Sequence, residues 1–160
     1  MSDLSHLDNQ GRARMVDVGG KTVTDRWAKA RAEVRVSPEL YAKLESNSLE
    51  KGDAVSVARI AGIQAAKRAA ELIPLCHPIT LTHIDVEILF QAPDRVIIAS
   101  QVRASALTGA EMEALTAASV AALTIYDMGK AIDRGIVIEK VELLEKGGGK
   151  SGLWQRKEDA

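Results

Sequence analysis

The sequence predicts an α+β protein in which two long helices cover one face of a single antiparallel sheet. Three observations support this class: segments that alternate strictly between apolar and polar residues, two alanine-rich segments with helical start and stop signals, and the order of these segments. The chain has 160 residues, of which 46% are hydrophobic and 27% charged, as in an ordinary globular domain. We therefore expect one domain over residues 1–160.

The first third of the chain predicts an arm, a strand and a short helix. Residues 1–27 contain several glycines and no sustained periodicity, so they are expected to form an irregular arm. The segment AKARAEVRV, residues 28–36, alternates apolar and charged side chains and indicates a half-buried strand. Ser37 and Pro38 then suit the N-cap and first position of a short helix.

The first long helix is expected between Asp53, as its N-cap, and Pro74, which would end it. Residues 83–90 follow as a strand that alternates between apolar and polar side chains, and residues 95–104 as an apolar strand. The short turn between them contains proline and aspartate, so the two segments predict a β-hairpin.

The second long helix is the strongest helical signal in the sequence. It is predicted to begin at a capping box formed by Thr108 and Glu111, and to end at Gly135. Residues 136–144 then supply a last strand, and the glycine-rich, charged residues 146–160 are expected to form a mobile tail. The order strand, helix, strand, strand, helix, strand is the βαββαβ arrangement of the ferredoxin-like fold.

The composition argues against several classes of protein. A formal net charge of −1 and an aromatic content of 3% disfavour a nucleic-acid-binding protein, which usually has a basic excess and stacking rings. There is no apolar run long enough to span a membrane, and the N-terminus lacks the apolar core of a signal peptide. A single cysteine cannot form an internal disulfide, so we expect a cytoplasmic protein.

The segment LIPLCHP, residues 72–78, places Cys76 and His77 between two prolines. A metal site is disfavoured because no further ligands lie at metal-binding spacing, and adjacent side chains of an extended segment point to opposite sides. The same geometry disfavours a Cys–His catalytic pair, which leaves Cys76 as a small buried residue. The loop is then either a stiff ledge that presents His77 and backbone N–H groups to a polar heterocycle, or a plain connection.

Carboxylates lie near both ends of the second long helix. Glu111 and Glu113 fall in its first turn, where the helix dipole favours them, whereas Asp127 and Lys130 are spaced as a surface ion pair. Glu113 and Asp127 are 14 positions apart in the sequence, about 21 Å along a helix. If both serve one small-molecule site, a second copy of the chain must contribute one of them, which implies a homo-oligomer.

Six segments of the chain resemble a known family: MVDV (15–18), KGD (51–53), ARIAGIQAAKR (58–68), LIPLCHP (72–78), GAEMEALTAASVAALTIYDMGKA (109–131) and GGKSG (148–152). They are similar to those of the cyclic pyranopterin monophosphate synthases, the molybdenum cofactor biosynthesis accessory protein C or MoaC family. The resemblance covers nearly the whole chain. Two positions depart from it, since Ala110 stands for an expected valine and Gly129 for a common cysteine.

The resemblance implies a lyase of molybdenum cofactor biosynthesis with a ferredoxin-like fold, which needs no cofactor and assembles as a homohexamer, a trimer of dimers, with active sites between subunits. Its substrate would be 3′,8-cyclo-7,8-dihydro-GTP, converted to cyclic pyranopterin monophosphate with release of pyrophosphate. The family's catalytic residues correspond to Lys51, Asp127 and Lys130. The residues expected to bind substrate are Asp17, Leu75, Cys76, His77, Arg103, Glu111, Met112, Glu113, Lys146 and Lys150.

Two alternatives belong to other functional classes. A ferredoxin-like regulatory module could bind a small ligand without any turnover, although the resemblance gathers many ionisable residues at one site. An RNA-binding sheet is disfavoured because the predicted strands lack the aromatic pairs that such sheets use.

Overall fold

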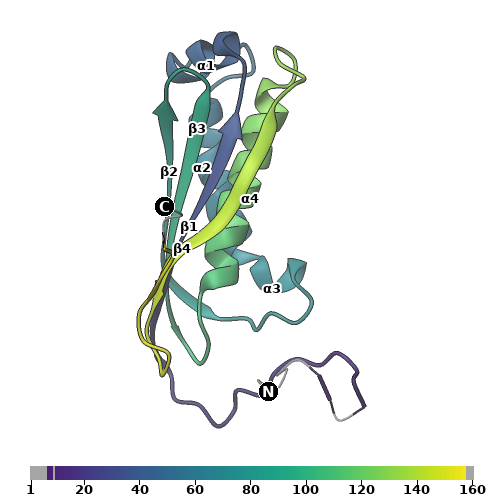
Figure 1. The fold of residues 1–160 in the computed structure, drawn as a ribbon, viewed down its shortest axis with the longest axis vertical. Coiled ribbons are helices and arrows are strands. Elements are labelled where there is room, and N and C mark those ends of the chain that lie inside the picture. Colours follow the sequence, from purple (N-terminus) through teal and green to yellow (C-terminus); the bar gives the residue numbers. More distant parts are fainter. Residues whose placement is uncertain (1–6, 9, 158–160) are drawn as a thin grey trace.

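The computed structural model describes residues 7–8 and 10–157, and its centre is one antiparallel sheet (Figure 1). The strands lie in the order β2-β3-β1-β4-β5, and all neighbouring strands are antiparallel. The order of β1 to β4 is that of the ferredoxin-like fold, so the predicted fold class is confirmed. The strands are β1 (Thr24–Arg35), β2 (Thr80–Gln91), β3 (Arg95–Ala106), β4 (Val137–Gly147) and β5 (Trp154–Gln155).

The helices of the described residues lie on one side of this sheet (Figure 1). The two long ones, α2 and α4, pack against each other and cover the sheet, and the short α1 lies at one end of the molecule. The α3 helix follows α2 and leads into the loop that contains Cys76 and His77. Their bounds are α1 (Pro38–Glu45), α2 (Ala54–Lys67), α3 (Ala69–Leu72) and α4 (Glu111–Gly129).

Small side chains allow α2, α4 and the sheet to approach closely. A Cβ atom at Gly62 of α2 would lie 2.9 Å from the Ala117 carbonyl oxygen of α4. The hydroxyl of Ser100, on β3, donates to the Ala114 carbonyl oxygen at 2.7 Å and so joins the sheet to α4. The alanines that α4 buries completely are Ala114, Ala117, Ala118, Ala121 and Ala122. This packing fixes the axis of α4, and with it the positions of the side chains at both of its ends.

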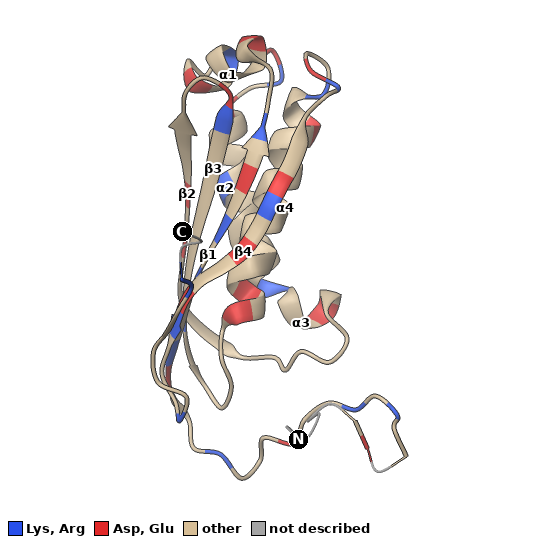
Figure 2. Ribbon diagram, viewed as in Figure 1, with Lys and Arg blue, Asp and Glu red and all other residues tan. Residues whose placement is uncertain are grey.

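The alternation predicted for the first strand is confirmed. Alternate residues of β1 from Ala28 to Val34 are buried under the helices, while the residues between them lie on the open face. Figure 2 shows positive and negative residues following one another along β1 and β4. Among them, Arg31 contacts Glu142 at 2.5 Å and Arg35 contacts Glu139 at 2.6 Å. The sheet therefore has one apolar face and one face of paired charges.

The predicted N-caps of the earlier helices are confirmed. The Ser37 side chain accepts a hydrogen bond from the Leu40 N–H at 3.2 Å, with Pro38 at the start of α1. The Asp53 carboxylate accepts from the Ser56 N–H at 2.9 Å and caps α2. Both contacts satisfy backbone donors that the first turn of a helix leaves free.

Three predicted helix boundaries are wrong. The capping box of the last helix does not form, because Ala110 is the N-cap of α4 and Glu111 contacts Lys146 instead. That helix ends at Gly129, six residues before Gly135, and the intervening residues form a turn. The first long helix is interrupted at Arg68, which separates α2 from α3, and α3 ends two residues before Pro74.

The irregular arm and the irregular tail are both shorter in the structure than predicted. The strand β1 begins at Thr24, so residues 24–27 of the predicted arm belong to the sheet. At the other end, β4 continues to Gly147 and residues 154–155 return as β5 along its edge. Residues 1–6, 9 and 158–160 of the arm and tail lie outside the described residues.

Candidate active site

The three predicted catalytic residues lie together at the C-terminal end of α4. We call Lys51, Asp127 and Lys130 the C-terminal cluster. The Asp127 carboxylate accepts a hydrogen bond from the Lys130 ammonium at 2.6 Å. Lys51, in the loop between α1 and α2, reaches the same turn and donates to the Asp127 carbonyl oxygen at 3.0 Å. The C-terminal end of α4 thus has one carboxylate paired with one ammonium, and a second ammonium hydrogen-bonded to the backbone of the same aspartate.

The cations control the protonation of this cluster. The Lys130 ammonium donates to Asp127 and, with Lys51 close by, holds the pKa of the Asp127 carboxyl below its usual range. The same hydrogen bond raises the pKa of Lys130. Asp127 is therefore an anion and Lys130 a cation at neutral pH, and both side chains are more than half exposed to solvent.

A second group of site residues surrounds the N-terminal end of α4, and we call Cys76, Glu111, Glu113 and Lys146 the N-terminal cluster. Glu113 is 3% exposed, and its Oε2 atom has no hydrogen-bond partner within the described part of the chain. Cys76 lies against the other carboxylate oxygen, at 3.8 Å from Sγ to Oε1. A carboxylate in such surroundings has lost most of the water that stabilises its charge.

Burial changes the acid–base chemistry of both groups. It raises the pKa of Glu113, and the neighbouring Glu111 carboxylate acts in the same direction. Burial also raises the pKa of the Cys76 thiol to about 11, with the Glu113 charge as the next cause. At neutral pH the thiol is protonated and a poor nucleophile, as expected for a small buried residue.

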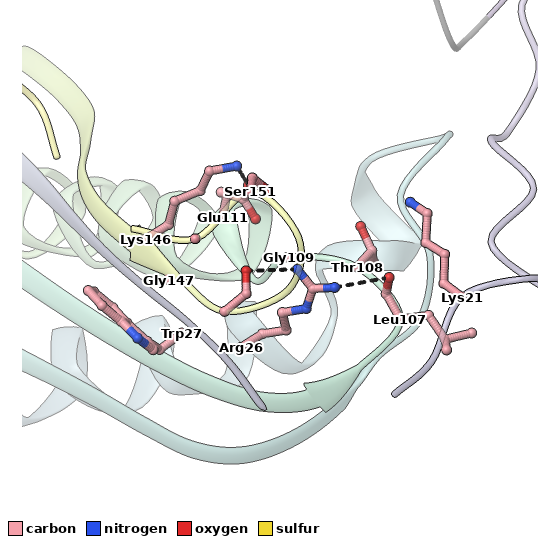
Figure 3. Close-up of a pocket in the computed structure, with 12 residues that line it drawn as sticks. Lys21, Arg26, Trp27, Leu107, Thr108, Gly109, Glu111, Lys146, Gly147 and Ser151 are labelled. Atoms are coloured by element: carbon pink, nitrogen blue, oxygen red, sulfur yellow. Dashed lines mark hydrogen bonds and ion pairs between the residues drawn. The ribbon is translucent and has the colours of Figure 1, made fainter. Parts of the chain in front are cut away.

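The Glu111–Lys146 pair forms one wall of a cavity of about 160 Å³ (Figure 3). The Lys146 ammonium donates to the Glu111 carboxylate at 2.5 Å, so the end of β4 is tied to the first turn of α4. Opposite this pair, the Arg26 guanidinium donates to the Gly148 and Leu107 carbonyl oxygens at 3.1 and 3.5 Å. Cations from three parts of the chain therefore surround one hollow. Its lining includes Lys21, Arg26, Trp27, Thr108, Glu111, Lys146, Gly148 and Ser151.

The proline-bounded loop sends its two adjacent side chains in different directions. Cys76 faces Glu113 of α4, whereas the His77 ring lies 2.6 Å from the Val16 carbonyl oxygen of the N-terminal arm. The Cys76 N–H donates to the Ile73 carbonyl oxygen in a turn, so this backbone donor of the loop is already used. His77 therefore secures the arm to the loop beside the N-terminal cluster.

The remaining predicted binding residues are spread around these hollows. Asp17, next to Val16, accepts a hydrogen bond from the Gly19 N–H at 2.8 Å and is exposed. Lys150 lines a hollow next to the first, with which it shares Lys21 and Arg26. Arg103 is exposed on β3, in a hollow that also includes Arg26. Leu75 and Met112 are half-buried, the first in the loop and the second in the first turn of α4.

The prediction missed Arg26, which is the centre of this region. It lines three adjoining hollows and contacts the backbone of two loops. Residues 1–27 were predicted to be an irregular arm. The side to which the Arg26 side chain points could therefore not be predicted from a strand pattern. Lys21 and Ser151 were missed for a related reason, because their places along the cavity depend on how the arm and the glycine-rich loop fold back.

One chain does not bring the two clusters together. Asp127 and Glu113 lie on the same unbroken α4 helix, 14 positions apart, so about 21 Å of helix separates them. No single small molecule can contact both within one chain. Among the described residues, no three His, Cys, Asp or Glu side chains gather as a metal ion would require, and no helix is long and apolar enough to cross a membrane.

Comparisons with known proteins match nearly the whole chain. The model of the MoaC family matches residues 15–149, which include every residue of both clusters. The chain belongs to the MoaC family. A curated relative from Thermomicrobium roseum, named cyclic pyranopterin monophosphate synthase, is 51% identical over 160 residues, covering 99% of this chain and 96% of the relative. As a MoaC protein the chain is an enzyme of molybdenum cofactor biosynthesis, as the resemblance implied.

Proposed function

We propose that this chain converts 3′,8-cyclo-7,8-dihydro-GTP into cyclic pyranopterin monophosphate and releases pyrophosphate. The observation that carries the proposal is the C-terminal cluster, in which Lys51, Asp127 and Lys130 form one proton-transferring group. The printed name of the relative from Thermomicrobium roseum supports the product. The reaction opens and recloses a purine-derived ring, which needs proton donors and acceptors at fixed places.

The cluster suggests a division of roles that the sequence could not supply. Lys130 is hydrogen-bonded to Asp127, which raises its pKa and keeps it protonated. We assign it the role of proton donor, with Asp127 holding the ammonium in place. Lys51 touches only the backbone of Asp127 in this cluster, so its ammonium is free to turn toward a ligand, and we assign it to proton transfer at the heterocycle.

The cations around the cavity suit the triphosphate. Arg26, Lys146 and Lys150 line adjoining hollows, and Arg103 lies beside the next one. Formation of the cyclic phosphate joins a sugar oxygen to the first phosphorus and breaks its bond to pyrophosphate, so negative charge grows on the leaving group. Fixed cations near that charge stabilise the transition state. The other substrate-binding residues, among them His77 and Glu113, would then face the heterocycle.

The separation of the two clusters requires a second chain. We infer that each active site takes its C-terminal cluster from one protomer and its N-terminal cluster from another. This agrees with the homo-oligomer expected from the sequence, a hexamer built as a trimer of dimers. A two-fold arrangement would place two equivalent sites at each interface, because every contact in it occurs twice.

Turnover of the cyclised dihydro-GTP by the purified chain tests the reaction. We expect stoichiometric release of pyrophosphate, measured with a coupled pyrophosphatase assay, and a product whose mass corresponds to cyclic pyranopterin monophosphate. A ligand-binding module would instead bind the substrate at equilibrium and return it unchanged. That result would overturn the proposal.

Mixed oligomers test whether a site is shared between chains. We would co-express a Lys51→Ala chain with a Glu113→Gln chain, each inactive alone, and purify the mixed species with two different tags. If the site is shared, half of the randomly paired dimers contain one chain of each kind, and one of the two sites in each such dimer is intact. We therefore expect roughly a quarter of the wild-type activity. If each chain held a complete site, the mixture would remain inactive.

A further inference from the structure

The glycine-rich loop between β4 and β5, residues 148–153, is held at both of its ends. This loop carries Lys150 and Ser151, which line the hollows around Arg26. A flexible segment with the same residues would have to order itself each time an anion binds, at an entropic cost. The contacts at the two ends therefore decide how well the loop is prepared for a ligand.

The first end of the loop packs directly against the start of β1. Gly148 and Gly149 have φ angles of +97° and +67°, which favour glycine. A Cβ atom at Gly148 would collide with the Asp25 carbonyl oxygen, and one at Gly149 with the Arg26 guanidinium. Arg26 also donates to the Gly148 carbonyl oxygen at 3.1 Å. The loop thus begins in close contact with a residue of the cavity.

The second end is fixed by β5 and by Arg156, the residue that follows it. The Arg156 N–H donates to the Leu144 carbonyl oxygen at 2.8 Å and continues the β4–β5 pairing. Its guanidinium Nε donates to the Leu143 carbonyl oxygen at 2.8 Å and lies 3.2 Å from the Glu142 carboxylate. The same guanidinium lies over the Trp154 ring, 5.9 Å from its centre. One side chain therefore contacts both strands on the open face of the sheet.

We propose that Arg156 is a positioning residue: it holds the far end of the glycine-rich loop and thereby keeps Lys150 at the anion-binding hollow. Arg156 itself lines a separate groove on the open sheet face, with Arg31 and Lys140, and does not line the cavity of Lys146 and Arg26. Its effect on a ligand must pass through the loop. The identity of that ligand as a polyphosphate rests on the proposed function.

The test compares Arg156→Ala with Arg35→Ala in the full chain. Arg35 is the matched control, because it makes a similar arginine–glutamate pair, with Glu139, on the same face but at the far end of β1. Two quantities are measured: the kinetic constants for the cyclised dihydro-GTP, and the dissociation constant of inorganic pyrophosphate by titration calorimetry. We expect Arg156→Ala to raise KM and the pyrophosphate Kd about tenfold with kcat little changed, and Arg35→Ala to change neither.

A double-mutant cycle with Lys150→Ala shows whether the effect passes through the loop. If Arg156 acts by placing Lys150, then Arg156→Ala causes no further loss in the Lys150→Ala background. Arg156→Lys should restore binding only in part, since a lysine keeps the charge near Glu142 but lacks the Nε donor to Leu143. Thermal unfolding of each variant confirms that it is folded.

Each outcome decides a separate point. Wild-type KM and pyrophosphate binding in a folded Arg156→Ala variant would overturn the positioning role and leave the proposed function intact. Equal losses in the wild-type and Lys150→Ala backgrounds would overturn the path through Lys150. A chain that does not turn over the substrate, but whose pyrophosphate binding weakens in Arg156→Ala, would contradict the proposed function and support the positioning role.

Discussion

The two ends of α4 carry the same chemical group in opposite environments. Glu113, in the first turn, is almost completely buried, and burial raises the pKa of its carboxyl. Asp127, in the last turns, is mostly exposed, and the Lys130 ammonium lowers the pKa of its carboxyl. Position along the helix would suggest the reverse, because the dipole favours a carboxylate at the N-terminal end and disfavours one at the C-terminal end.

The comparison shows which effects dominate at each end. At Glu113 the loss of water outweighs the helix N-terminus, because burial raises the pKa more than the backbone N–H and the Cys76 thiol lower it. At Asp127 a direct ion pair outweighs an unfavourable dipole. The buried end is therefore suited to contact a neutral heterocycle, and the exposed end is suited to move protons near solvent.

The largest effects are expected at the exposed end. Lys51→Ala removes a proton-transferring group, and Asp127→Asn removes the anion that holds the proton donor Lys130. Each should lower kcat by about 10²–10⁴-fold, the usual range for loss of general acid–base catalysis. Pyrophosphate release under saturating substrate measures this. Near-wild-type kcat in a folded oligomer of either variant would remove the C-terminal cluster from the catalytic machinery.

A control variant at another lysine, Lys67, separates the fall in kcat of Lys51→Ala from a general effect of losing a surface charge. Lys67 lies exposed in the last turn of α2, so Lys67→Ala removes one cation from a helix end without touching α4. We expect its kcat to equal that of the wild type. A similar fall in both lysine variants would point to a general electrostatic effect and would weaken the contrast between the two ends of α4.

The thiol at the buried end should be slow to react. With a pKa raised to about 11, Cys76 at pH 8 has a thiolate fraction ~100-fold smaller than an ordinary thiol with a pKa of 9.0. Alkylation by iodoacetamide, followed by mass spectrometry, measures the rate against the same chain in denaturant. Glu113→Gln should accelerate it, because the neighbouring charge is one of the causes of the shift. Equal rates in the folded and denatured chain would show that the buried end is open to solvent.

The sequence predicted the fold because its main signals are local. Alternation in β1 and β2, the N-caps at Ser37 and Asp53, and the hairpin turn depend on neighbouring residues only, and each was confirmed. The predicted start of α4 was wrong where a tertiary contact competes with the local signal. Lys146 draws Glu111 into an ion pair, so the capping box that the sequence suggested does not form.

The site was harder to predict where it depends on segments that are distant in the sequence and fold back onto one another. Lys51, Asp127 and Lys130 were chosen by resemblance, and the structure brings them together in one chain. Arg26 carried no such signal, because its importance comes from two loops that fold onto it from residues 107 and 148. Contacts between segments so far apart in the sequence cannot be read from periodicity.

The close packing of α2 against the middle of α4 depends on a glycine, Gly62. Gly62→Ala would place a Cβ atom 2.9 Å from the Ala117 carbonyl oxygen, which is backbone and cannot move aside. We expect a loss of about 1–3 kcal/mol in the free energy of unfolding, measured by urea denaturation. Gly20→Ala is the control, since nothing lies within 4 Å of a Cβ atom there. Equal stability of the two variants would mean that α2 leaves room for α4 to shift.

The smallest expected effect is a change of stability with pH, which tests the opposite pKa shifts of Glu113 and Asp127 directly. A carboxyl whose pKa is raised by folding, as at Glu113, stabilises the protein below its unfolded pKa, and this contribution is lost as pH rises through the folded pKa. Glu113→Gln does not titrate, so its stability relative to the wild type should rise as the pH increases from 5 to 8. Thermal unfolding at several pH values measures the difference.

Asp127→Asn should show the opposite slope. Folding lowers the pKa of this carboxyl, so its contribution is present above the unfolded pKa and is lost as pH falls through the folded pKa. The variant should therefore be less stable than the wild type at neutral pH, and the difference should shrink below pH 4. Slopes of the same sign in the two variants would contradict the opposite pKa shifts at the two ends of α4.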